Sequence, residues 1–519
     1  MAVIVPQTDV YLLKVPLEID EMNQLTFSNK QAQFNYFNSL PKIPAYDFTY
    51  QRRDETIRFG MCIDDILEYN YVMYRNEAYT DKWFYAFITD MEYLNDNVTA
   101  IGIKSDVWQC WQFDLNFKPV FVEREHVNDD TIGANLVPES LETGEYIQNG
   151  SPERFGFYLN RYVINATYEP YTDTRYMGSD VAGIPMAGGL FVFNNWQQMN
   201  NAIQDYANRG RLEAIANVYA VPYTSFNDSD LDLREGSAGD PDFDYYAFTG
   251  STAPKASTVT ISRPNTIDGY TPKNNKLLTY PYQNAVITNN NGTVNNLYYE
   301  YFSNPASITI EAIASPTIGA SIFVYPKNYK KIENNFNEGL MAGKYPTLSW
   351  SGDTYTNWLT QNAVNISAGV ISDVAKLPII PYNPVVGTAN LASSIANQIS
   401  EVYKHSLVSQ SVIGNTNGGD VLTGNKINNI YIYKMSITNQ FARIIDQFFS
   451  EFGYKVNSVK VPNITGRRNW NYVKTIGCYI EAHIPQDDLQ EIKGMFDTGV
   501  TFWHNPATFA DYSQNNDIL

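Results

Sequence analysis

Cysteine and histidine are scarce in this chain, which has three cysteines and four histidines in 519 residues. The cysteines are too few and too widely spaced for a disulfide framework or a CxxC metal site. No histidine lies in an HExxH motif, and the chain lacks a GxSxG elbow, a phosphate-binding GxxxxGK[ST] loop and a GxGxxG pattern. The sequence therefore predicts no metal, no cofactor and no enzyme.

Basic residues are also few. The chain has 36 Lys and Arg against 55 Asp and Glu, a net charge of −19. This balance argues against a protein that grips nucleic acid through its phosphates. The excess is concentrated in residues 1–150, where 24 acidic residues face 11 basic ones. We therefore expect an acidic surface or channel on this part of the chain.

A secretory signal is not visible at the start, MAVIVPQTDV, which has no basic region and no long apolar region. With 44% hydrophobic and 18% charged residues, the chain is expected to be globular. Its length exceeds what one hydrophobic core usually holds, so two to four domains are predicted. Synthesis in the cytoplasm is the expectation.

Aromatic residues are abundant, at 14% of the chain, and favour strands. Aromatic runs at 82–94 and 99–117 predict two strands joined by a turn at Asn95-Asp96-Asn97. Residues 285–299 predict a hairpin around Asn291-Gly292, and residues 307–324 two further strands. The expected fold class is mainly β with a few helices (α+β), in several domains.

Helical periodicity occurs in three places. Residues 194–219 predict a helix pair or one kinked helix that ends before Pro222. Phe441, Ile444, Ile445, Phe448, Phe449 and Phe452 predict an amphipathic helix closed by Gly453. Leu489, Ile492 and Phe496 predict another. Residues 224–275 are expected to form a long loop region with short strands.

Three polar features invite functional interpretations, each with an ordinary alternative. His126 follows Glu123-Arg124-Glu125 and fits either acid–base chemistry or a polar strand end, or an intersubunit salt bridge. The acidic run from Asp228 to Asp244 fits a solvated loop better than a calcium site, because Leu233 stands where a calcium loop needs glycine. Arg467-Arg468 beside Trp470 fits phosphate or base binding, or an intersubunit ion pair.

The segment 363–400 differs from the rest of the chain. Asp373 and Lys376 are its only charged residues, and none follows between Leu377 and Ser400. Pro378, Pro381 and Pro384 interrupt it, so one membrane-spanning helix of about 20 residues is not expected. Two short apolar elements fit better, as a buried pair, a loop without function, or a segment that meets lipid when several copies associate.

The candidate membrane-active residues are the large aliphatic side chains of this segment. They are Val364, Ile366, Val370, Ile371, Val374, Leu377, Ile379, Ile380, Val385, Val386, Leu391, Ile395 and Ile399.

A family resemblance is carried by residues 121–146, FVEREHVNDDTIGANLVPESLETGEY. Further stretches agree in the same order: YPTLSWSGDTYTNWLTQN at 345–362, the region 414–463, and 469–505 at the end. Over most of its length the chain resembles the distal tail tube, or tail knob, proteins of small short-tailed bacteriophages of the picovirus group, which infect Gram-positive bacteria.

The resemblance implies a six-fold tube at the tail tip, with β-barrel-like domains similar to phage tail hub proteins. By position, 363–400 corresponds to an apolar loop that plugs the channel and enters the host cell membrane as a pore. The implied partners are further copies in a homohexamer, other tail and collar proteins and host membrane lipids. Genomic DNA would pass through without sequence-specific binding, and the implied location is the virion tail tip.

The expected organisation combines these observations. It comprises an acidic β-rich tube domain (1–150), connecting strands and a helix pair (151–222), a second β-rich region (223–344), a lead-in (345–362), the apolar loop (363–413) and a C-terminal α+β segment completing the tube (414–519).

Two rival functions remain open. One is a host cell-wall receptor-binding tail protein without pore activity, since aromatic, Asn-rich β-domains often bind glycans. The other is a wall hydrolase on a tail scaffold. The absence of a catalytic motif argues against the second.

Overall fold

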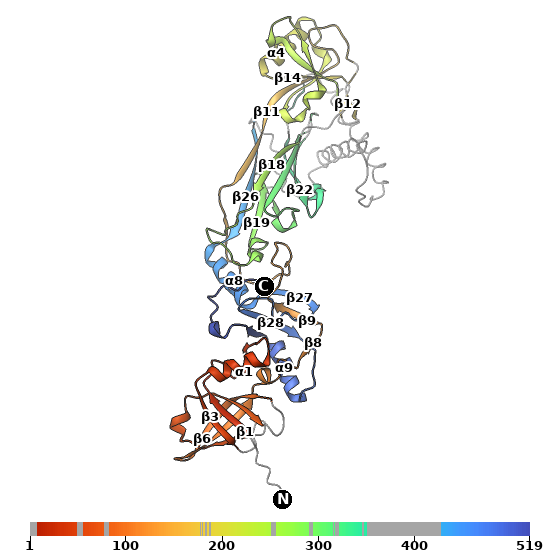
Figure 1. The fold of residues 1–519 in the computed structure, drawn as a ribbon. Helices are drawn as coiled ribbons and strands as arrows, with labels where there is room; N and C mark the ends of the chain where they lie inside the picture. The colour runs from red at the N-terminus through yellow and green to blue at the C-terminus, as the bar shows by residue number, and fades with distance from the viewer. Residues whose placement is uncertain are drawn as a thin grey trace. The chain divides into compact units, whose positions relative to one another are not determined.

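The computed structural model describes residues 8–48, 56–76, 82–176, 178, 180–181, 184–185, 188–250, 256–289, 294–314, 316, 321–344, 347–349 and 427–519 (Figure 1). The chain divides into two compact units. Unit 1 combines Met1–Glu142, Pro272–Leu277 and Gln440–Leu519. Unit 2 combines Thr143–Thr271 and Leu278–Asn439.

Unit 1 contains a six-stranded antiparallel sheet in the order β3-β1-β5-β6-β7-β4. Its side chains alternate between two buried faces. Val10, Leu12 and Val72 lie in one core, whereas Leu13 and Tyr71 lie in the other. The strands are β1 (Thr8–Leu13), β3 (Lys42–Phe48), β4 (Ile57–Phe59), β5 (Tyr71–Asn76), β6 (Phe84–Asn95) and β7 (Val98–Ser105).

A five-stranded sheet in the order β2-β30-β28-β9-β27 joins the two ends of the chain. β2 (Asn23–Leu25) pairs in parallel with β30 (Val500–Trp503). β9 (Val120–Glu125) lies between β27 (Tyr454–Lys460) and β28 (Trp470–Ile476), orange between blue in Figure 1. β8 (Asn116–Phe117) and β29 (Ile480–Glu481) form a separate small pair.

Among its described residues, unit 1 has five α-helices. Side-chain caps fix two starts: Asn29 accepts a hydrogen bond from Ala32 N at 2.8 Å, and Asp106 accepts one from Gln109 N at 3.0 Å. Gly453, at φ +65°, ends the longest of these helices. The helices are α1 (Lys30–Ser39), α2 (Ile63–Ile66), α3 (Val107–Trp111), α8 (Asn439–Phe452, all but its first residue in unit 1) and α9 (Gln486–Thr498).

The composition of unit 1 differs from the contiguous ranges expected from the sequence. Strands from both ends of the chain share the five-stranded sheet, so 1–142 and 440–519 form one body. Trp470 and Trp503 pack in the same core as Leu13 and Phe37. Neither terminal segment can therefore bury its apolar face without the other.

Unit 2 is built on a ten-stranded sheet that runs β16-β17-β14-β11-β26-β19-β20, with β10, β15 and β25 off this path. The long strand β11 (Glu153–Ala166) pairs with β26 through residues 153–158 and with β15 through 159–166. The other strands are β10 (Tyr146–Gln148), β14 (Gly189–Phe193), β15 (Ile215–Pro222), β16 (Leu231–Glu235), β17 (Asp244–Phe248), β19 (Gln283–Thr288), β20 (Val294–Leu297), β25 (Thr347–Ser349) and β26 (Ile427–Ile437).

A five-stranded sheet packs on this one through a shared core that includes Ile287, Ile310 and Ile430. Its strands are β18 (Ser257–Ser262), β21 (Ser307–Ala314), β22 (Ser321–Tyr329), β23 (Ile332–Asn334) and β24 (Leu340–Lys344). The described part of the unit also contains a short pair, β12 (Asp180–Val181) with β13 (Ile184–Pro185), and the helix α4 (Trp196–Asn208).

Most of the local predictions are confirmed. β6 and β7 pair across the predicted turn, where the Asn95 side chain accepts from Asn97 N at 2.9 Å. β19 pairs with β20, although the turn at Asn291-Gly292 lies outside the described residues, and β21 pairs with β22. The helices predicted around Phe449 and Ile492 are α8 and α9.

Two local predictions were wrong. The helical period at 194–219 continues only to Asn208, and Ile215–Pro222 is the strand β15. Seven of the eight residues of this strand are buried, so its apolar side chains show no two-residue alternation. Within 99–117 the strand ends at Ser105, because Asp106 caps the short helix α3.

Candidate functional site

The predicted membrane-active segment, with all thirteen of its candidate residues, lies outside the described residues. The strands that bracket it belong to one sheet. β25 pairs with β15 through Val218 and Leu348, and β26 pairs with β11 and β19. In the chain the segment is therefore an insertion between two strands of the ten-stranded sheet. No helix among the described residues has the length and apolar character that a membrane crossing requires.

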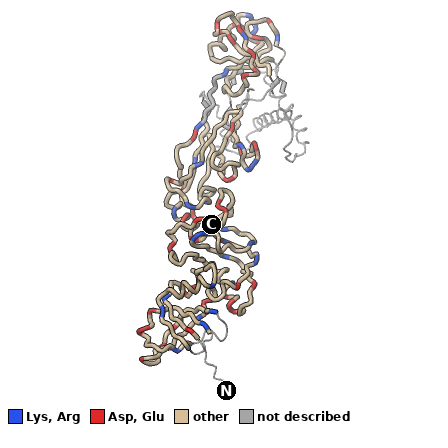
Figure 2. The backbone as a smooth tube through the Cα atoms, viewed as in Figure 1, with Lys and Arg blue, Asp and Glu red and all other residues tan. Residues whose placement is uncertain are grey.

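Part of the acidic excess of the N-terminal residues lies on an exposed part of unit 1, which we call the acidic tip (Figure 2). β6 pairs with β5 only through Phe84–Phe87, so residues 88–95 pair with β7 alone, and β7 in turn pairs with β4 through residues 99–101. The short helix α2 lies beside it. The acidic tip comprises six exposed acidic residues, Asp64, Asp65, Glu68, Asp90, Glu92 and Asp96.

In the part of unit 1 that the structure describes, two basic residues lie near the acidic tip. Lys14 pairs with Glu68 at 3.3 Å, and the exposed Arg58 lies on the neighbouring strand β4. Large apolar side chains are also exposed there, on Leu67, Tyr93 and Leu94. The expected acidic surface is thus present on unit 1, mixed with apolar residues.

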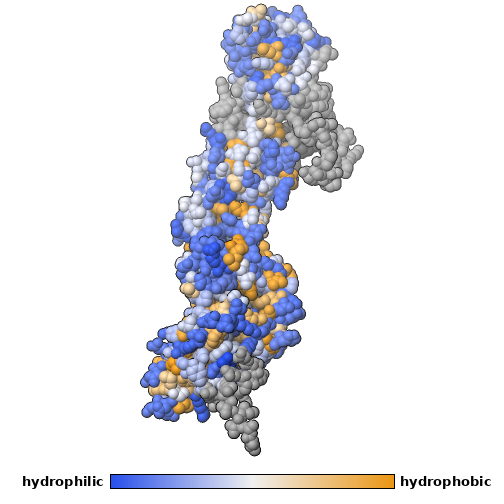
Figure 3. Space-filling model, in the orientation of Figure 1, coloured by the Kyte–Doolittle hydropathy of each residue, from blue (hydrophilic) through white to orange (hydrophobic). Residues whose placement is uncertain are grey.

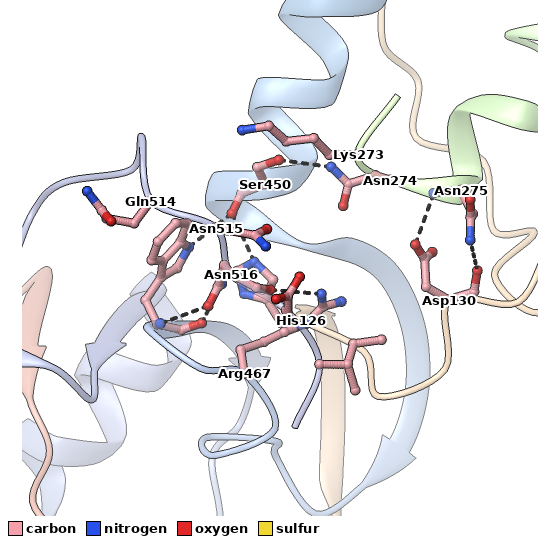
Figure 4. Close-up of a pocket in the computed structure, with 13 residues that line it drawn as sticks. His126, Asp130, Lys273, Asn274, Asn275, Ser450, Arg467, Gln514, Asn515 and Asn516 are labelled. Atoms are coloured by element: carbon pink, nitrogen blue, oxygen red, sulfur yellow. Dashed lines mark hydrogen bonds between the residues drawn. The ribbon is translucent and has the colours of Figure 1, made fainter. Parts of the chain in front are cut away.

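A polar cavity of about 260 Å³ in unit 1 gathers His126, Asp130 and Arg467 with residues 273–275 and 514–518 (Figure 4). His126 follows the end of β9. Its Nδ1 accepts a hydrogen bond from Tyr472 N at 2.8 Å, and its Nε2 lies 3.1 Å from the Ser450 carbonyl oxygen. Burial lowers the pKa of His126 to about 3, so the ring is neutral at physiological pH. This geometry is that of a polar strand end rather than an acid–base catalyst.

Two carboxylates, one lining this cavity and one behind it on α8, bind the segment 272–277 in unit 1. Asp446 of α8 accepts from Lys273 N at 2.7 Å and from Asn274 N at 3.0 Å. Asp130 accepts from Asn275 N at 2.9 Å and from Tyr454 Oη at 2.6 Å. Burial raises the pKa of Asp130, which these bonds partly offset. These carboxylates and their donors satisfy one another's hydrogen bonds, so the polar residues at the cavity have a structural role.

The basic-aromatic group at Arg467, Arg468 and Trp470 does not form a phosphate- or base-binding platform. Trp470 is fully buried and cannot stack on a base. Arg467 donates to the carbonyl oxygens of Val127 at 2.9 Å and Asn516 at 3.3 Å. Arg468 is exposed, 3.9 Å from Asp517. An intersubunit ion pair at Arg468 stays a prediction.

A buried ion cluster lies beside the cavity. The Glu139 carboxylate pairs with both Lys276 and Arg124, and accepts from Lys455 N at 3.0 Å. The side chains of Glu139 and Lys276 are only 1% and 4% exposed. Lys276 also donates to the Val137 carbonyl oxygen at 2.8 Å. Burial lowers the pKa of Lys276, and the nearby Glu139 carboxylate partly offsets this shift.

The acidic run from Asp228 to Asp244 is divided between strands and turns of unit 2. Asp228 pairs with Arg161 at 3.2 Å and accepts from Tyr223 Oη at 3.0 Å, while Asp232 pairs with Arg234 at 2.7 Å. Within the described ranges, no group of three or more His, Cys, Asp or Glu side chains could hold a metal ion.

Glu21, which precedes β2, pairs with Lys104 of β7, and Lys104 also pairs with Glu491 of α9 at 2.6 Å. Burial, with the neighbouring Glu491 charge, raises the pKa of Glu21 to about 7. The folded protein therefore resists ionisation of Glu21, and this group lowers stability progressively as pH rises from the unfolded pKa near 4.5 through 7. We expect Glu21→Gln to be more stable than wild type at pH 8, on the order of 1 kcal/mol because Glu21 is partly solvated.

Thermal melts at pH 5 and pH 8 would measure this. The advantage of Glu21→Gln should shrink at pH 5, where the wild-type group is already protonated in the folded state. Glu18→Gln removes the same charge from an exposed position nearby and should not reproduce the trend. A pH-independent difference for Glu21→Gln would contradict the assignment.

Sequence comparison adds what the geometry alone does not give. The family described as "Bacillus phage phi29, Tail knob protein gp9, C-terminal domain" matches residues 248–517, more than half of the chain. The chain belongs to this tail knob family. A second family, "Caudoviral major tail protein N-terminus", matches residues 6–116.

Whole-length relatives agree with this assignment. The chain is 25% identical to the tail knob protein gp9 of Bacillus phage B103, and 24% identical to those of Bacillus phages PZA and phi29. Each match covers 98% of both chains. The tail knob protein gp12 of bacteriophage C1 has the same fold, with a TM-score of 0.65 and 16% identity over 99% of this chain and 100% of that one.

The chain is therefore a structural component of a podophage tail. The predicted family, the mainly β multi-domain fold and the structural rather than enzymatic role are confirmed. A place in the virion tail follows from the same relatives.

Proposed function

We propose that six copies of this chain form the distal tube of the tail, through which the genome leaves the virion. We further propose that the apolar segment 363–400 plugs the lumen and then enters the host cell membrane as a pore. The observation that carries the proposal is an uncharged run from Leu377 to Ser400, inserted between two strands of one sheet in a tail knob protein.

The charge of the chain supports a conduit. A net charge of −19 repels phosphate, so a duplex can slide past without being held at each step. A surface that neutralised phosphates would bind DNA and slow its passage. Which acidic residues face the lumen would follow from the arrangement of the copies.

The composition of the segment supports two burial states. Aliphatic residues alternate with Gly, Ala, Ser and Asn, small side chains that allow close helix packing in lipid. Six copies in one lumen could bury one another before release and line a pore afterwards. Such exchange of partners needs only a small free-energy difference between the two states.

Electron microscopy of purified protein combined with dye release from liposomes tests this proposal. We expect six-fold rings with a filled centre, and dye release once the segment is freed. Ile379→Asp with Ile380→Asp should reduce release, because each charge at the membrane centre costs roughly 3 kcal/mol. Ser237→Asp with Ala238→Asp adds the same charge at an exposed turn and serves as the control.

A host-wall binding protein without pore activity would give a different pattern. It would bind purified cell walls and leave liposomes intact, in both the wild type and the Ile379/Ile380 variant. That result would reject the pore and retain the structural tail role.

A further inference from the structure

The solvent face of the five-stranded sheet in unit 1 carries an apolar row, which we call the sheet-edge patch. It comprises Phe121 of β9, Val459 of the edge strand β27 and Ile476 of β28. Phe121 pairs directly with both Val459 and Ile476. Side chains of directly paired residues lie on the same face of a sheet, so the three form one continuous row across three strands.

The sheet-edge patch is exposed although its strands have a normal core on the other face. Phe121, Val459 and Ile476 are 37%, 70% and 58% exposed. Their chain neighbours Val122 and Thr475 are buried. The solvent face of an antiparallel sheet is usually polar, so an in-register row of Phe, Val and Ile points to a binding surface. Figure 3 shows apolar surface at the position of β9 and β27 in Figure 1.

The surroundings of the sheet-edge patch are more basic than the rest of this acidic chain. β27 carries Lys455 and Lys460 and no acidic residue, and Lys474 of β28 pairs with Glu123 at 3.0 Å. Lys460 is paired in register with the buried Val120, so its side chain lies on the other face of β27, where it pairs with the buried Glu125.

The acidic tip has the complementary chemistry. It presents six carboxylates and the exposed apolar side chains of Leu67 and Tyr93, whereas the sheet-edge patch has Lys455 and Lys474 beside its apolar row. The two surfaces belong to different sheets of unit 1, so one copy can use both at once. Contact between two different surfaces of identical subunits is the heterologous type, which forms a ring when the rotation between copies closes and a filament when it does not.

We infer that the sheet-edge patch of one copy docks on the acidic tip of the next, and that this contact closes the ring of unit 1. The inference rests on the proposed ring of copies and names the surfaces that build it. The apolar side chains of the two surfaces exclude water at the centre of the contact. The lysines and carboxylates at its rim set the pairing, and make like surfaces repel.

Cross-linking within intact virions tests the contact. Phage carrying Val459→Cys and Tyr93→Cys in a Cys62→Ser background are treated with a short bis-maleimide, since Cys110 and Cys478 are buried. We expect a ladder of knob multimers, and monomers only when either cysteine is introduced alone. Links from Val459→Cys to another virion protein, in place of a second copy, would overturn the inference.

A charge test gives an independent readout. Val459→Glu puts a carboxylate opposite the acidic tip and should lower incorporation of the knob protein into virions roughly tenfold. Adding Glu92→Lys and Asp96→Lys should restore incorporation. Val294→Glu, at an apolar position of similar exposure in unit 2, should have no effect. Normal melting of the purified variants would show that folding is intact.

A failure of the inferred docking surfaces can be distinguished from a failure of the proposed ring. A generic amine cross-linker applied to wild-type virions reports whether knob copies contact one another at all. Multimers with that reagent, but no cysteine ladder and normal incorporation of Val459→Glu, would reject these surfaces and retain the ring. An absence of multimers with every reagent would reject the ring itself, and the inference with it.

Discussion

Phage in which residues 363–400 are deleted should assemble complete tails and adsorb to cells, yet lose infectivity by orders of magnitude. In the proposed function this segment alone supplies the apolar surface that enters the membrane. We expect the sheet to form without it, because among the described residues β25 already pairs with β15, and β26 with β11 and β19. Plaque counts, adsorption and the protein composition of purified virions measure the three parts of this expectation.

A matched control replaces 363–400 with a Gly/Ser linker of equal length. The linker keeps the loop length, and the deletion changes loop-closure entropy only slightly, because this entropy depends weakly on length. A defect that both variants share therefore reports the missing apolar residues. Both variants should be equally deficient. Normal plaque numbers from either one would remove the segment from genome delivery, whereas failure to assemble tails would indicate a structural role instead.

The sequence predicted elements whose signal is local. The hairpin of β6 and β7 has an aromatic run on each side of an Asn-rich turn, and α8 and α9 have a clear apolar period. β15 was missed because a strand buried on both faces has no alternating pattern. Asp106 is the N-cap of helix α3 and is a residue type that favours this position. The apolar residues on both sides of Asp106 nevertheless resembled one continuous strand.

The sequence alone did not predict the contacts between distant segments. Asp446 binds Asn274, and Glu139 binds Lys276, across more than 130 residues. Nothing in the spacing of these residues indicates that 272–277 enters unit 1. The tail function was recognised from family resemblance, not from periodicity or charge, and the sheet-edge patch appears only once the register of β9, β27 and β28 is known.

Glu139→Ala should lower the free energy of unfolding of unit 1 by about 3–5 kcal/mol, because it leaves a buried lysine and a largely buried arginine without their carboxylate. Lys276 would keep the Val137 carbonyl oxygen as a neutral partner, and Arg124 would keep that of Gly453 at 2.7 Å. Neither replaces a charge. Urea unfolding followed by the fluorescence of the buried Trp470 and Trp503 reports on this unit.

Charge alone and burial can be separated with two further variants. Glu142→Gln removes the same charge from an exposed site three residues away and should change stability little. Glu139→Met combined with Lys276→Met removes both buried charges and should recover part of the loss, since apolar pairs of similar volume often replace buried ion pairs at little cost. Arg124 would still lack its carboxylate in this double variant, so recovery should be incomplete. If Glu139→Ala lost no more stability than Glu142→Gln, the buried ion cluster would not contribute to the stability of unit 1.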